Sequence, residues 1–199
     1  DKEHGYWVKF HQSGIVREIL NFESGLIDGT RILINKKGKI IEQENFSYNK
    51  LHGLQKYFHD TGKLKMEVNY SNGVLSGQFI KYYRNGKKQE SCYYKEGMKD
   101  GKSIWFYENE TISIEYPYEM GKINGIAKTF YSDGSLKSES TYLNNELNGE
   151  EKSYYNSKML KIKGFYKNGK KEGKWYTYDE SGAVIEINKY KNGVKKWKE

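Results

Sequence analysis

Residues Gly77–Asp100, GQFIKYYRNGKKQESCYYKEGMKD, are one copy of a 24-residue unit that recurs through this 199-residue chain. A glycine opens every copy, at residues 5, 29, 53, 77, 101, 125, 149 and 173, with no insertion or deletion between copies. The tenth and twenty-first positions of the unit hold glycine in six of the eight copies each. Twenty of the 21 glycines therefore occupy three of the 24 positions. A fixed period of this length is the sequence mark of a repeat protein.

The period divides the chain into eight repeats after a short N-terminal segment, residues 1–4. Repeats of this kind contact mainly their neighbours, so we expect one array instead of one or two globular domains. Positions 1 to 24 are counted from the opening glycine of each repeat. The repeats are residues 5–28, 29–52, 53–76, 77–100, 101–124, 125–148, 149–172 and 173–197.

Each repeat is predicted to be a β-hairpin followed by a second turn. Position 18 is aromatic in all eight repeats and position 6 in seven, while position 12 is aliphatic in seven. Two short runs of β-formers around a glycine indicate a hairpin. A three-residue loop closed by a left-handed glycine at position 10 tolerates the varied residues before that glycine, and it sets position 6 opposite position 12. We therefore expect positions 6, 12 and 18 to form one layer.

Position 21 accepts only glycine or asparagine, the residues that best tolerate the left-handed region, and this marks the second turn. The predicted fold is all-β: an elongated, open antiparallel meander of about 16 strands, in the form of a twisted ribbon.

Two repeats depart from the pattern. Glu110 and Lys158 replace the glycine of the first turn, and Gly164 lies outside the three glycine positions. Pro117, the single proline, falls inside a predicted strand, where it predicts a bulge or local break because proline cannot donate to a sheet ladder. Neutral drift and bending of the ribbon are both open explanations for these departures.

The unit reads Gly-x-x-x-x-Tyr-Tyr-x-x-Gly-x-Leu and then x-Glu-x-x-Tyr-x-Asn-Gly-x-x-x-Gly. Gly77–Asp100 and Gly125–Asn148 (GIAKTFYSDGSLKSESTYLNNELN) are clear examples. This pattern resembles the MORN repeat, in the bacterial variant of the YwqK antitoxin-like group, from Gly5 to Trp197. The resemblance implies stacked hairpins in a twisted sheet and a binding or scaffolding role. It implies membrane-surface roles for some members and antitoxin or immunity roles for the bacterial variant. It carries no catalytic motif, so no catalytic residue is assigned.

The residues give little support for enzyme or cofactor chemistry. Cys92 is the single cysteine, which excludes an internal disulfide and a cysteine-based zinc site. His11 and His59 lie about four strands or ~19 Å apart in the repeat geometry, too far to share a metal. His52 and His59 have no carboxylate or thiol cluster around them, and no glycine loop opens a helix as a phosphate site requires. Glutamates recur at position 15, where pairing with lysines on neighbouring strands is expected. We expect no enzyme activity, no cofactor and no metal. No apolar run approaches the ~18 residues of a membrane-spanning helix.

Aromatic residues at positions 3, 5 and 7 form the candidate partner-binding surface. On the predicted layering they lie on the face opposite positions 6, 12 and 18. Tyrosine and tryptophan are favoured anchors of protein interfaces, although these rings could instead stabilise neighbouring strands. The candidates are Phe79, Tyr83, Trp105, Tyr107, Tyr131, Tyr155 and Trp175.

The net charge of +8 is concentrated at the C-terminal end, where residues 158–199 hold 12 lysines against five acids. Solvated strand faces are the first explanation, and contact with an anionic surface is the second. The lysines that would make this contact are Lys170, Lys171, Lys195, Lys196 and Lys198. Nucleic acid is not favoured because only three of the 34 basic residues are arginine.

Three functions fit this sequence. The first is a non-enzymatic protein-binding scaffold with an antitoxin, immunity or host-contact role. The second is glycan binding at a cell surface through Trp105, Tyr107 and Trp175. The third is peripheral attachment to an anionic membrane. Self-association end to end or through sheet edges is a further expectation. The chain begins at Asp1 without methionine, so removal of a leader and removal of upstream repeats are both open explanations. An exported or cell-surface bacterial protein is favoured over a cytoplasmic one.

Overall fold

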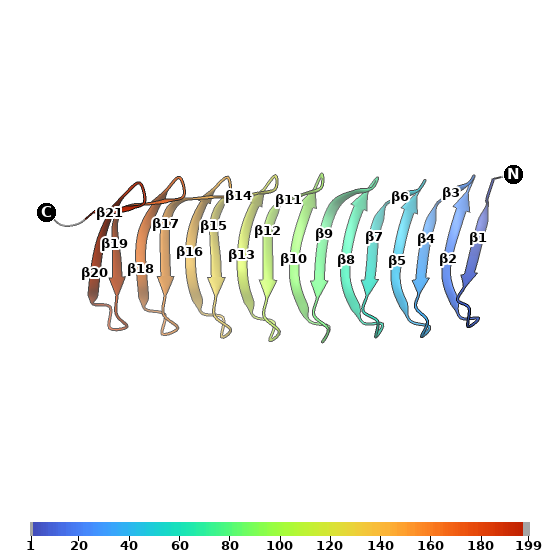
Figure 1. The fold of residues 1–199 in the computed structure, drawn as a ribbon, viewed down its shortest axis with the longest axis horizontal. Helices are drawn as coiled ribbons and strands as arrows, with labels where there is room; N and C mark the ends of the chain where they lie inside the picture. The colour runs from blue at the N-terminus through green and yellow to red at the C-terminus, as the bar shows by residue number, and fades with distance from the viewer. Residues whose placement is uncertain (1, 197–199) are drawn as a thin grey trace. The chain divides into compact units, whose positions relative to one another are not determined.

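The computed structural model describes residues 2–196. These residues contain 21 β-strands and no helix, and so no helix that could span a membrane. They divide into two compact halves, which we treat separately: Asp1–Met98 and Lys99–Glu199. All strand pairs within each half are antiparallel between elements that follow one another closely in the chain, as Figure 1 shows. The predicted all-β antiparallel meander of 24-residue repeats is confirmed.

The N-terminal half contains β1 (Gly5–Phe10), β2 (Val16–Glu23), β3 (Leu26–Ile27), β4 (Gly29–Ile34), β5 (Ile40–Ser47), β6 (Lys50–Leu51), β7 (Gly53–Phe58), β8 (Leu64–Ser71), β9 (Val74–Tyr82) and β10 (Lys88–Lys95). Strand β11 (Met98–Lys99) spans the division between the halves. The C-terminal half continues with β12 (Gly101–Phe106), β13 (Ile112–Glu119), β14 (Lys122–Ile123), β15 (Gly125–Phe130), β16 (Leu136–Leu143), β17 (Glu146–Tyr154), β18 (Leu160–Lys167), β19 (Lys170–Tyr178), β20 (Val184–Lys191) and β21 (Val194–Lys196).

The first turn of each repeat is the predicted three-residue loop. In repeat 1 the Gly14 N–H donates to the His11 carbonyl at 2.9 Å, and the His11 N–H donates to the Ile15 carbonyl at 2.8 Å. Gly14 has a φ of 83°. Glu110 and Lys158 take the same conformation, with φ of 73° and 68°. These two repeats therefore keep the standard turn and do not bend there.

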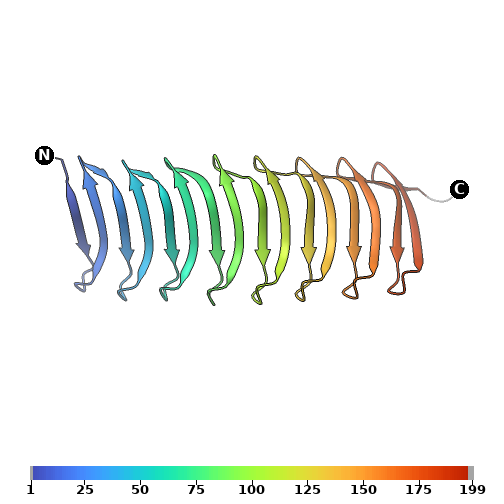
Figure 2. The same cartoon turned by 180° about the vertical axis from the view of Figure 1, so that it is seen from behind.

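The second turn is a two-residue loop in which positions 20 and 21 both have positive φ. Asn72 and Gly73 have φ of 49° and 83°, and Asn144 and Asn145 have 51° and 72°. This is the type I′ geometry, which favours Asn-Gly. Within each half, the first turns lie along one side of the meander and the second turns along the other (Figures 1 and 2).

One extra residue at position 13 decides which side chains share a face. In all eight hairpins position 1 pairs with 18, position 5 with 14 and position 6 with 12, so position 13 is skipped. Positions 6 and 12 do share a face, as predicted. Position 18 lies on the other face with positions 1, 3 and 5, because alternate strand residues point to opposite faces. The predicted layer of positions 6, 12 and 18 is therefore wrong.

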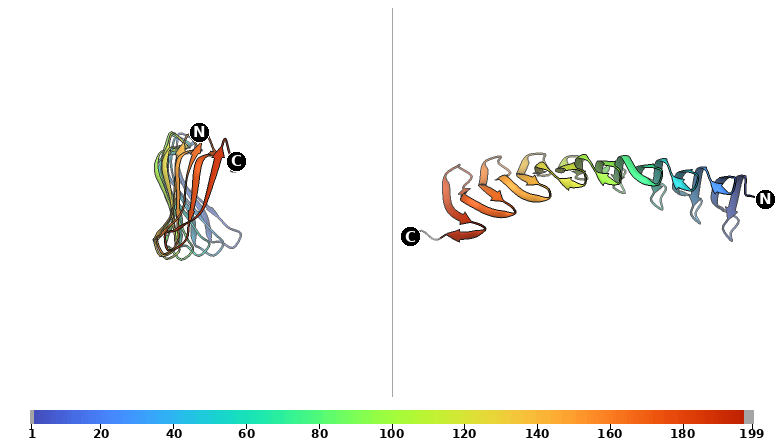
Figure 3. Two further views of the ribbon diagram at one scale, coloured as in Figure 1. Left: turned by 90° about the vertical axis from the view of Figure 1, so that its left-hand side faces the viewer. Right: turned by 90° about the horizontal axis from the view of Figure 1, so that it is seen from above.

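Positions 3, 5, 14, 16 and 18 form what we call the packed face. Its most buried apolar side chains are Leu20, Val68 and Cys92 at position 16, and Ala127 and Trp175 at position 3. The second face carries positions 2, 4, 6, 12, 15 and 17. The end-on and top views in Figure 3 show the curvature of the strands within each half.

Pro117 sits in an unbroken strand. It pairs with Lys102, and its carbonyl accepts a hydrogen bond from the Asn124 N–H at 2.9 Å. The N–H and C=O of a strand residue point the same way, so the N–H that proline lacks would face the residues around Gly125. These residues form a β-bulge and do not pair with β13. The bulge is thus a property of the repeat, and proline is tolerated there. Of the predicted bulge or local break, the bulge is present on the neighbouring strand, and β13 itself is not broken.

Candidate functional site

The position-7 tyrosines of the C-terminal half reach from one repeat to the next. The Tyr107 hydroxyl donates to the Phe130 carbonyl, Tyr131 to the Tyr154 carbonyl and Tyr155 to the Tyr178 carbonyl, each at 2.8 Å. Each acceptor is the position-6 carbonyl of the following repeat, and each ring is half-buried. We call Tyr107, Tyr131 and Tyr155, together with the turns that follow them, the tyrosine edge.

The same contact occurs with a different side chain in the N-terminal half. The His11 Nε2 lies 2.8 Å from the Ile34 carbonyl, again from position 7 to position 6 of the next repeat. Position 7 begins the turn, so its side chain lies beside the end of the neighbouring first strand. The polar atom of these residues thus ties two repeats together, and the ring remains partly accessible.

Lysines at the bulged position 13 cover part of two rings. The Lys137 ammonium lies 5.5 Å from the centroid of Tyr131, and the Lys161 ammonium lies 5.1 Å from that of Tyr155. Both are cation–π distances. The edge therefore presents aromatic rings with a cation at one side.

The turns beside these tyrosines are acidic. Residues 107–110, 131–134, 155–158 and 179–182 carry five acids and one lysine. Hydrogen bonds from Ser135 hold the pKa of Asp133 below its ordinary value, and those from Ser181 and Ala183 do the same for Asp179. These carboxylates stay charged over a wide pH range.

Phe79, Trp105 and Trp175 lie on the packed face with the position-18 aromatics, contrary to their predicted placement. Phe79 meets Tyr94 edge-on with a centroid distance of 5.9 Å. Trp105 meets Tyr116 in the same way at 5.8 Å. The skipped residue at position 13 is the physical reason, because it moves position 18 onto their side of the sheet.

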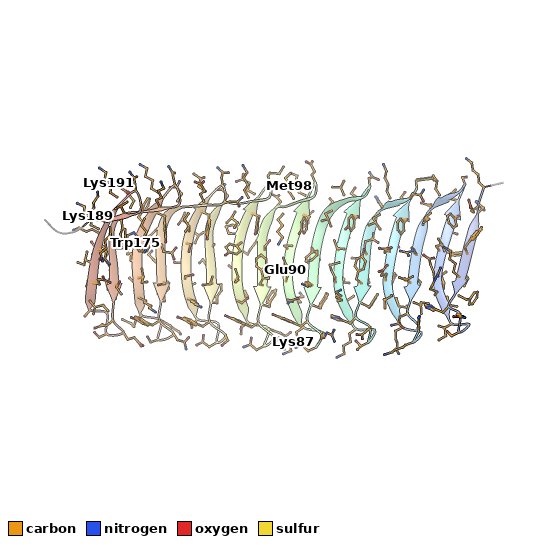
Figure 4. The ribbon with its side chains drawn as sticks, viewed as in Figure 1. Lys87, Glu90, Met98, Trp175, Lys189 and Lys191 are labelled. Carbon is orange, nitrogen blue, oxygen red and sulfur yellow. The ribbon has the colours of Figure 1, made fainter. Side chains whose placement is uncertain are left out.

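Trp175 is 6% exposed and lies directly over Gly164 on the neighbouring strand. Its ring meets Tyr166 at 5.0 Å and Tyr190 at 6.2 Å, and the Lys171 ammonium lies 4.1 Å from its centroid. Figure 4 labels it on β19. Because Gly164 has no side chain, it leaves room for this large ring. In the sequence, a glycine outside the three glycine positions, with a tryptophan in the next repeat, indicated this pair.

The predicted lysine surface lies beside the second turns of the last two repeats. The Lys171 ammonium makes cation–π contacts with the rings of Trp175 and Tyr190, and the Lys195 ammonium lies 3.7 Å from a Glu186 carboxylate oxygen. Lys170 and Lys196 are exposed, and Lys198 lies outside the described residues. Figure 4 shows two more lysines, Lys189 and Lys191, on the adjoining strand. Sequence reasoning did not include these two.

A connected ion-pair network lies on the packed face of the N-terminal half. The Arg31 guanidinium contacts Glu18 at 2.6 Å and Glu44 at 2.8 Å, and Lys9 contacts Glu18 at 2.9 Å. Burial raises the pKa of Glu18, but hydrogen bonds from Lys9 and Arg31 outweigh burial and hold that pKa below its ordinary value. Tyr57 completes the network through a 3.0 Å hydrogen bond to Glu44. Every charge here has an opposite partner, which is typical of a structural network.

Glu151 is the contrasting carboxyl. Burial raises its pKa, and the hydrogen bond from Ser140 and the charge of Lys171 offset this only in part.

The position-15 glutamates follow the predicted ladder: Glu67 lies 3.6 Å from Lys56, and Glu139 lies 3.1 Å from Lys128. Within residues 2–196, no three His, Cys, Asp or Glu side chains gather as a metal site would require.

Exposed apolar side chains on the second face were not predicted. Tyr93, Ile126 and Phe165 are each about half exposed, at positions 17, 2 and 17. Phe165 adjoins a hollow of about 350 Å³. The residues lining this hollow are Glu150, Lys163, Gly164, Phe165, Lys174 and Tyr176.

Comparison with known families identifies the repeat. The model of the MORN repeat variant matches six times, at residues 51–72, 75–96, 99–120, 123–144, 147–168 and 171–192. No curated protein matches the chain. MORN repeats are non-catalytic modules that commonly bind proteins or membranes. The six matches cover well over half of the sequence, and the chain belongs to the MORN repeat variant family.

Proposed function

We propose that the chain is a non-enzymatic scaffold that binds a partner protein along the tyrosine edge. The observation that carries this proposal is the set of three half-buried rings, each fixed by a 2.8 Å hydrogen bond to the next repeat. A ring that is already immobilised loses little side-chain entropy when a partner covers it. Tyrosine is also among the residues that dominate binding energy at interfaces.

The charge of the edge favours a basic partner. The adjoining turns carry five carboxylates against three lysines at this edge, Lys137, Lys158 and Lys161, and this excess of negative charge would speed association with a positively charged surface. Three successive repeats supply the same contact, so a partner could bridge several rings at once. The proposed partner surface therefore combines a basic rim with apolar pockets.

The test is affinity capture with the immobilised chain, followed by identification of the captured proteins. A partner held by the wild type should be lost with Tyr131→Ala combined with Tyr155→Ala. It should be retained with Tyr48→Ala, which removes an exposed tyrosine elsewhere in the protein. Capture that survives the double substitution in a folded protein would rule out the edge.

Loss of binding must be separated from loss of folding. Tyr131→Phe removes the hydrogen bond to the Tyr154 carbonyl but keeps the ring. If the ring is the anchor, this variant should bind nearly as well as the wild type at a temperature where both are folded. An antitoxin, immunity or host-contact role belongs to this proposal, and the identity of the captured protein decides between them.

Glycan binding is a second candidate because the hollow beside Phe165 combines exposed ring surface with charged groups. Trp175 is buried, Trp105 lies on the packed face and Tyr107 lies two repeats away, so none of the residues first considered lines this hollow. Phe165→Ala should abolish retention on a glycan array. An absence of retention by the wild type would eliminate this function.

Attachment to an anionic membrane is a third candidate, supported by the lysines beside the second turns of the last two repeats. Each lysine near an anionic surface contributes about 1 kcal/mol. Co-sedimentation with acidic vesicles should fall with Lys170→Gln combined with Lys196→Gln, and should weaken as salt rises. Binding that does not respond to salt would contradict it.

A further inference from the structure

A hollow occurs on the second face between consecutive repeats in both halves, where a β-bulge interrupts the pairing of the two repeats. Between repeats 3 and 4 it measures about 170 Å³. Its lining residues are Leu54, Glu67, Asn69, Gln78 and Ile80, at positions 2, 15 and 17 of one repeat and 2 and 4 of the next. The same positions of repeats 7 and 8 line the hollow beside Phe165, whose volume of about 350 Å³ is in the range of small-molecule sites. The repeat therefore builds the hollow, and its side chains decide what it can hold.

A polar side chain at position 17 caps a backbone carbonyl at this place in repeats 3 and 6. Asn69 Nδ2 donates to the Gln78 carbonyl at 3.1 Å, and the Thr141 hydroxyl donates to the Glu150 carbonyl at 3.1 Å. Both acceptors are at position 2 of the following repeat. In repeat 7, position 17 is Phe165, which has no donor, so the equivalent carbonyl of Lys174 does not receive this bond. The hollow between repeats 7 and 8 thus offers a hydrogen-bond acceptor.

Two aromatic rings line the same hollow. Phe165 is 47% exposed, and Tyr176 stacks on Tyr178 with a centroid distance of 6.3 Å and an interplanar angle of 28°. The apolar residues of the hollow between repeats 3 and 4, Leu54 and Ile80, have no ring. The face of an aromatic ring carries partial negative charge, so it attracts the C–H bonds on the flat side of a sugar.

Lysines give the hollow an excess of positive charge. Among its lining residues Glu150 alone carries a carboxylate, which already contacts Lys152 at 2.6 Å and Lys163 at 3.1 Å. Lys174 is exposed and forms no ion pair within residues 2–196. Its ammonium is therefore available to an anionic group of a ligand.

We propose that this hollow binds an acidic saccharide, a sugar that carries a carboxylate; this names the ligand class of the glycan-binding candidate and rests on it. The flat side of the sugar packs against Phe165 and Tyr176, its carboxylate contacts the Lys174 ammonium, and a hydroxyl donates to the Lys174 carbonyl. A neutral sugar leaves the ammonium without a partner. An aromatic anion without hydroxyl groups leaves the carbonyl without a donor. The acidic sugar is the ligand class that satisfies the rings, the cation and the acceptor together.

The ligand class is tested on a glycan array that pairs each uronic or sialic acid glycan with its carboxyl-reduced counterpart. Reduction replaces the carboxylate with a neutral alcohol and keeps the sugar ring. The full chain should retain the acidic members and not the reduced ones, and retention should weaken as salt rises. Equal retention of both members would overturn the acidic-sugar proposal and leave glycan binding standing. Retention of neither would eliminate both.

The site is tested by Phe165→Asn, which installs the residue found at position 17 of the first three repeats. This change removes the ring and supplies a donor for the Lys174 carbonyl, so binding of the acidic glycan in titration calorimetry should be lost. Urea unfolding and circular dichroism check that the variant is folded. The matched control, Tyr93→Asn, makes the same change at position 17 of repeat 4 and should bind like the wild type. Lys174→Gln should weaken binding roughly fivefold. Affinity untouched by Phe165→Asn, or by Lys174→Gln, would refute the assignment.

Discussion

Gly164→Ala is expected to destabilise the last two repeats, because the added methyl group would collide with Trp175. A Cβ built on Gly164 lies 2.2 Å from Trp175 Cδ2 and 2.3 Å from Cε2. The ring cannot step aside easily, since Tyr166 and Tyr190 meet it edge-on and Lys171 covers it. The glycine itself does not need a left-handed backbone, so the collision is the dominant effect.

Two opposing terms set the magnitude. Overpacking of a core costs about 1–3 kcal/mol. Replacing a strand glycine with alanine returns about 0.5–1 kcal/mol of conformational entropy. The expected net loss is therefore about 1–2 kcal/mol. In a Trp175→Ala background, which by itself costs about 3–5 kcal/mol, the collision is absent and Gly164→Ala should stabilise by about 0.5–1 kcal/mol.

The assay is a double-mutant cycle measured by urea unfolding. Amide hydrogen exchange of β18 and β19 locates the change, since repeats can open locally. The decisive feature is the reversal of sign between the two backgrounds. An equal cost in both backgrounds, or stabilisation of the wild type, would refute the fitted pair of Gly164 and Trp175.

Three further substitutions probe the turn, a buried carboxyl and the tyrosine edge. Lys158→Gly should raise the urea midpoint by the equivalent of about 1–2 kcal/mol, because Lys158 now holds a left-handed φ of 68°; an unchanged midpoint would contradict this. Burial raises the folded pKa of Glu151 above its unfolded value. The contribution of Glu151 to the free energy of unfolding is therefore fully present below the unfolded pKa and is lost as pH rises through the folded pKa. In Glu151→Gln, the free energy of unfolding measured from acidic to neutral pH should no longer show this loss. Identical pH profiles for the variant and the wild type would disprove it. Tyr131→Phe should cost about 1 kcal/mol in thermal unfolding by removing the bond to Tyr154, and an unaltered melting temperature would count against that bond.

The sequence was sufficient to predict the hairpins and the positions of both turns. Glycine at position 10 and Gly or Asn at position 21 report backbone conformations that few other residues adopt easily. Glu110 and Lys158 show the limit of that signal, because the surrounding hairpin holds them in the same conformation at a cost.

The assignment of side chains to faces could not be predicted in the same way. The extra residue at position 13 is Arg17 in the first repeat, Lys65 in the third and Ile185 in the last, so no residue type marks it. A skipped residue moves every later side chain of that strand to the opposite face of the sheet. The position-18 aromatics were therefore placed on the wrong side, and Trp175 was taken for a surface residue.

The candidate site was found in part. Tyr107, Tyr131 and Tyr155 were singled out by their period alone. The hydrogen-bond acceptors of their hydroxyls depend on how each turn lies beside the next repeat. The sequence period carries no information about that arrangement. The half-exposed Phe165 was missed because its position holds asparagine in the first three repeats, so no apolar column drew attention to it.

The most direct test of the proposed function is a hydrogen-exchange footprint of a captured partner on the intact chain. The account predicts slower exchange in and beside the turns at residues 107–111, 131–135 and 155–159 when the partner is added, with little change at the second turns. Protection confined to the second turns or to the strands of the N-terminal half would contradict binding along the tyrosine edge.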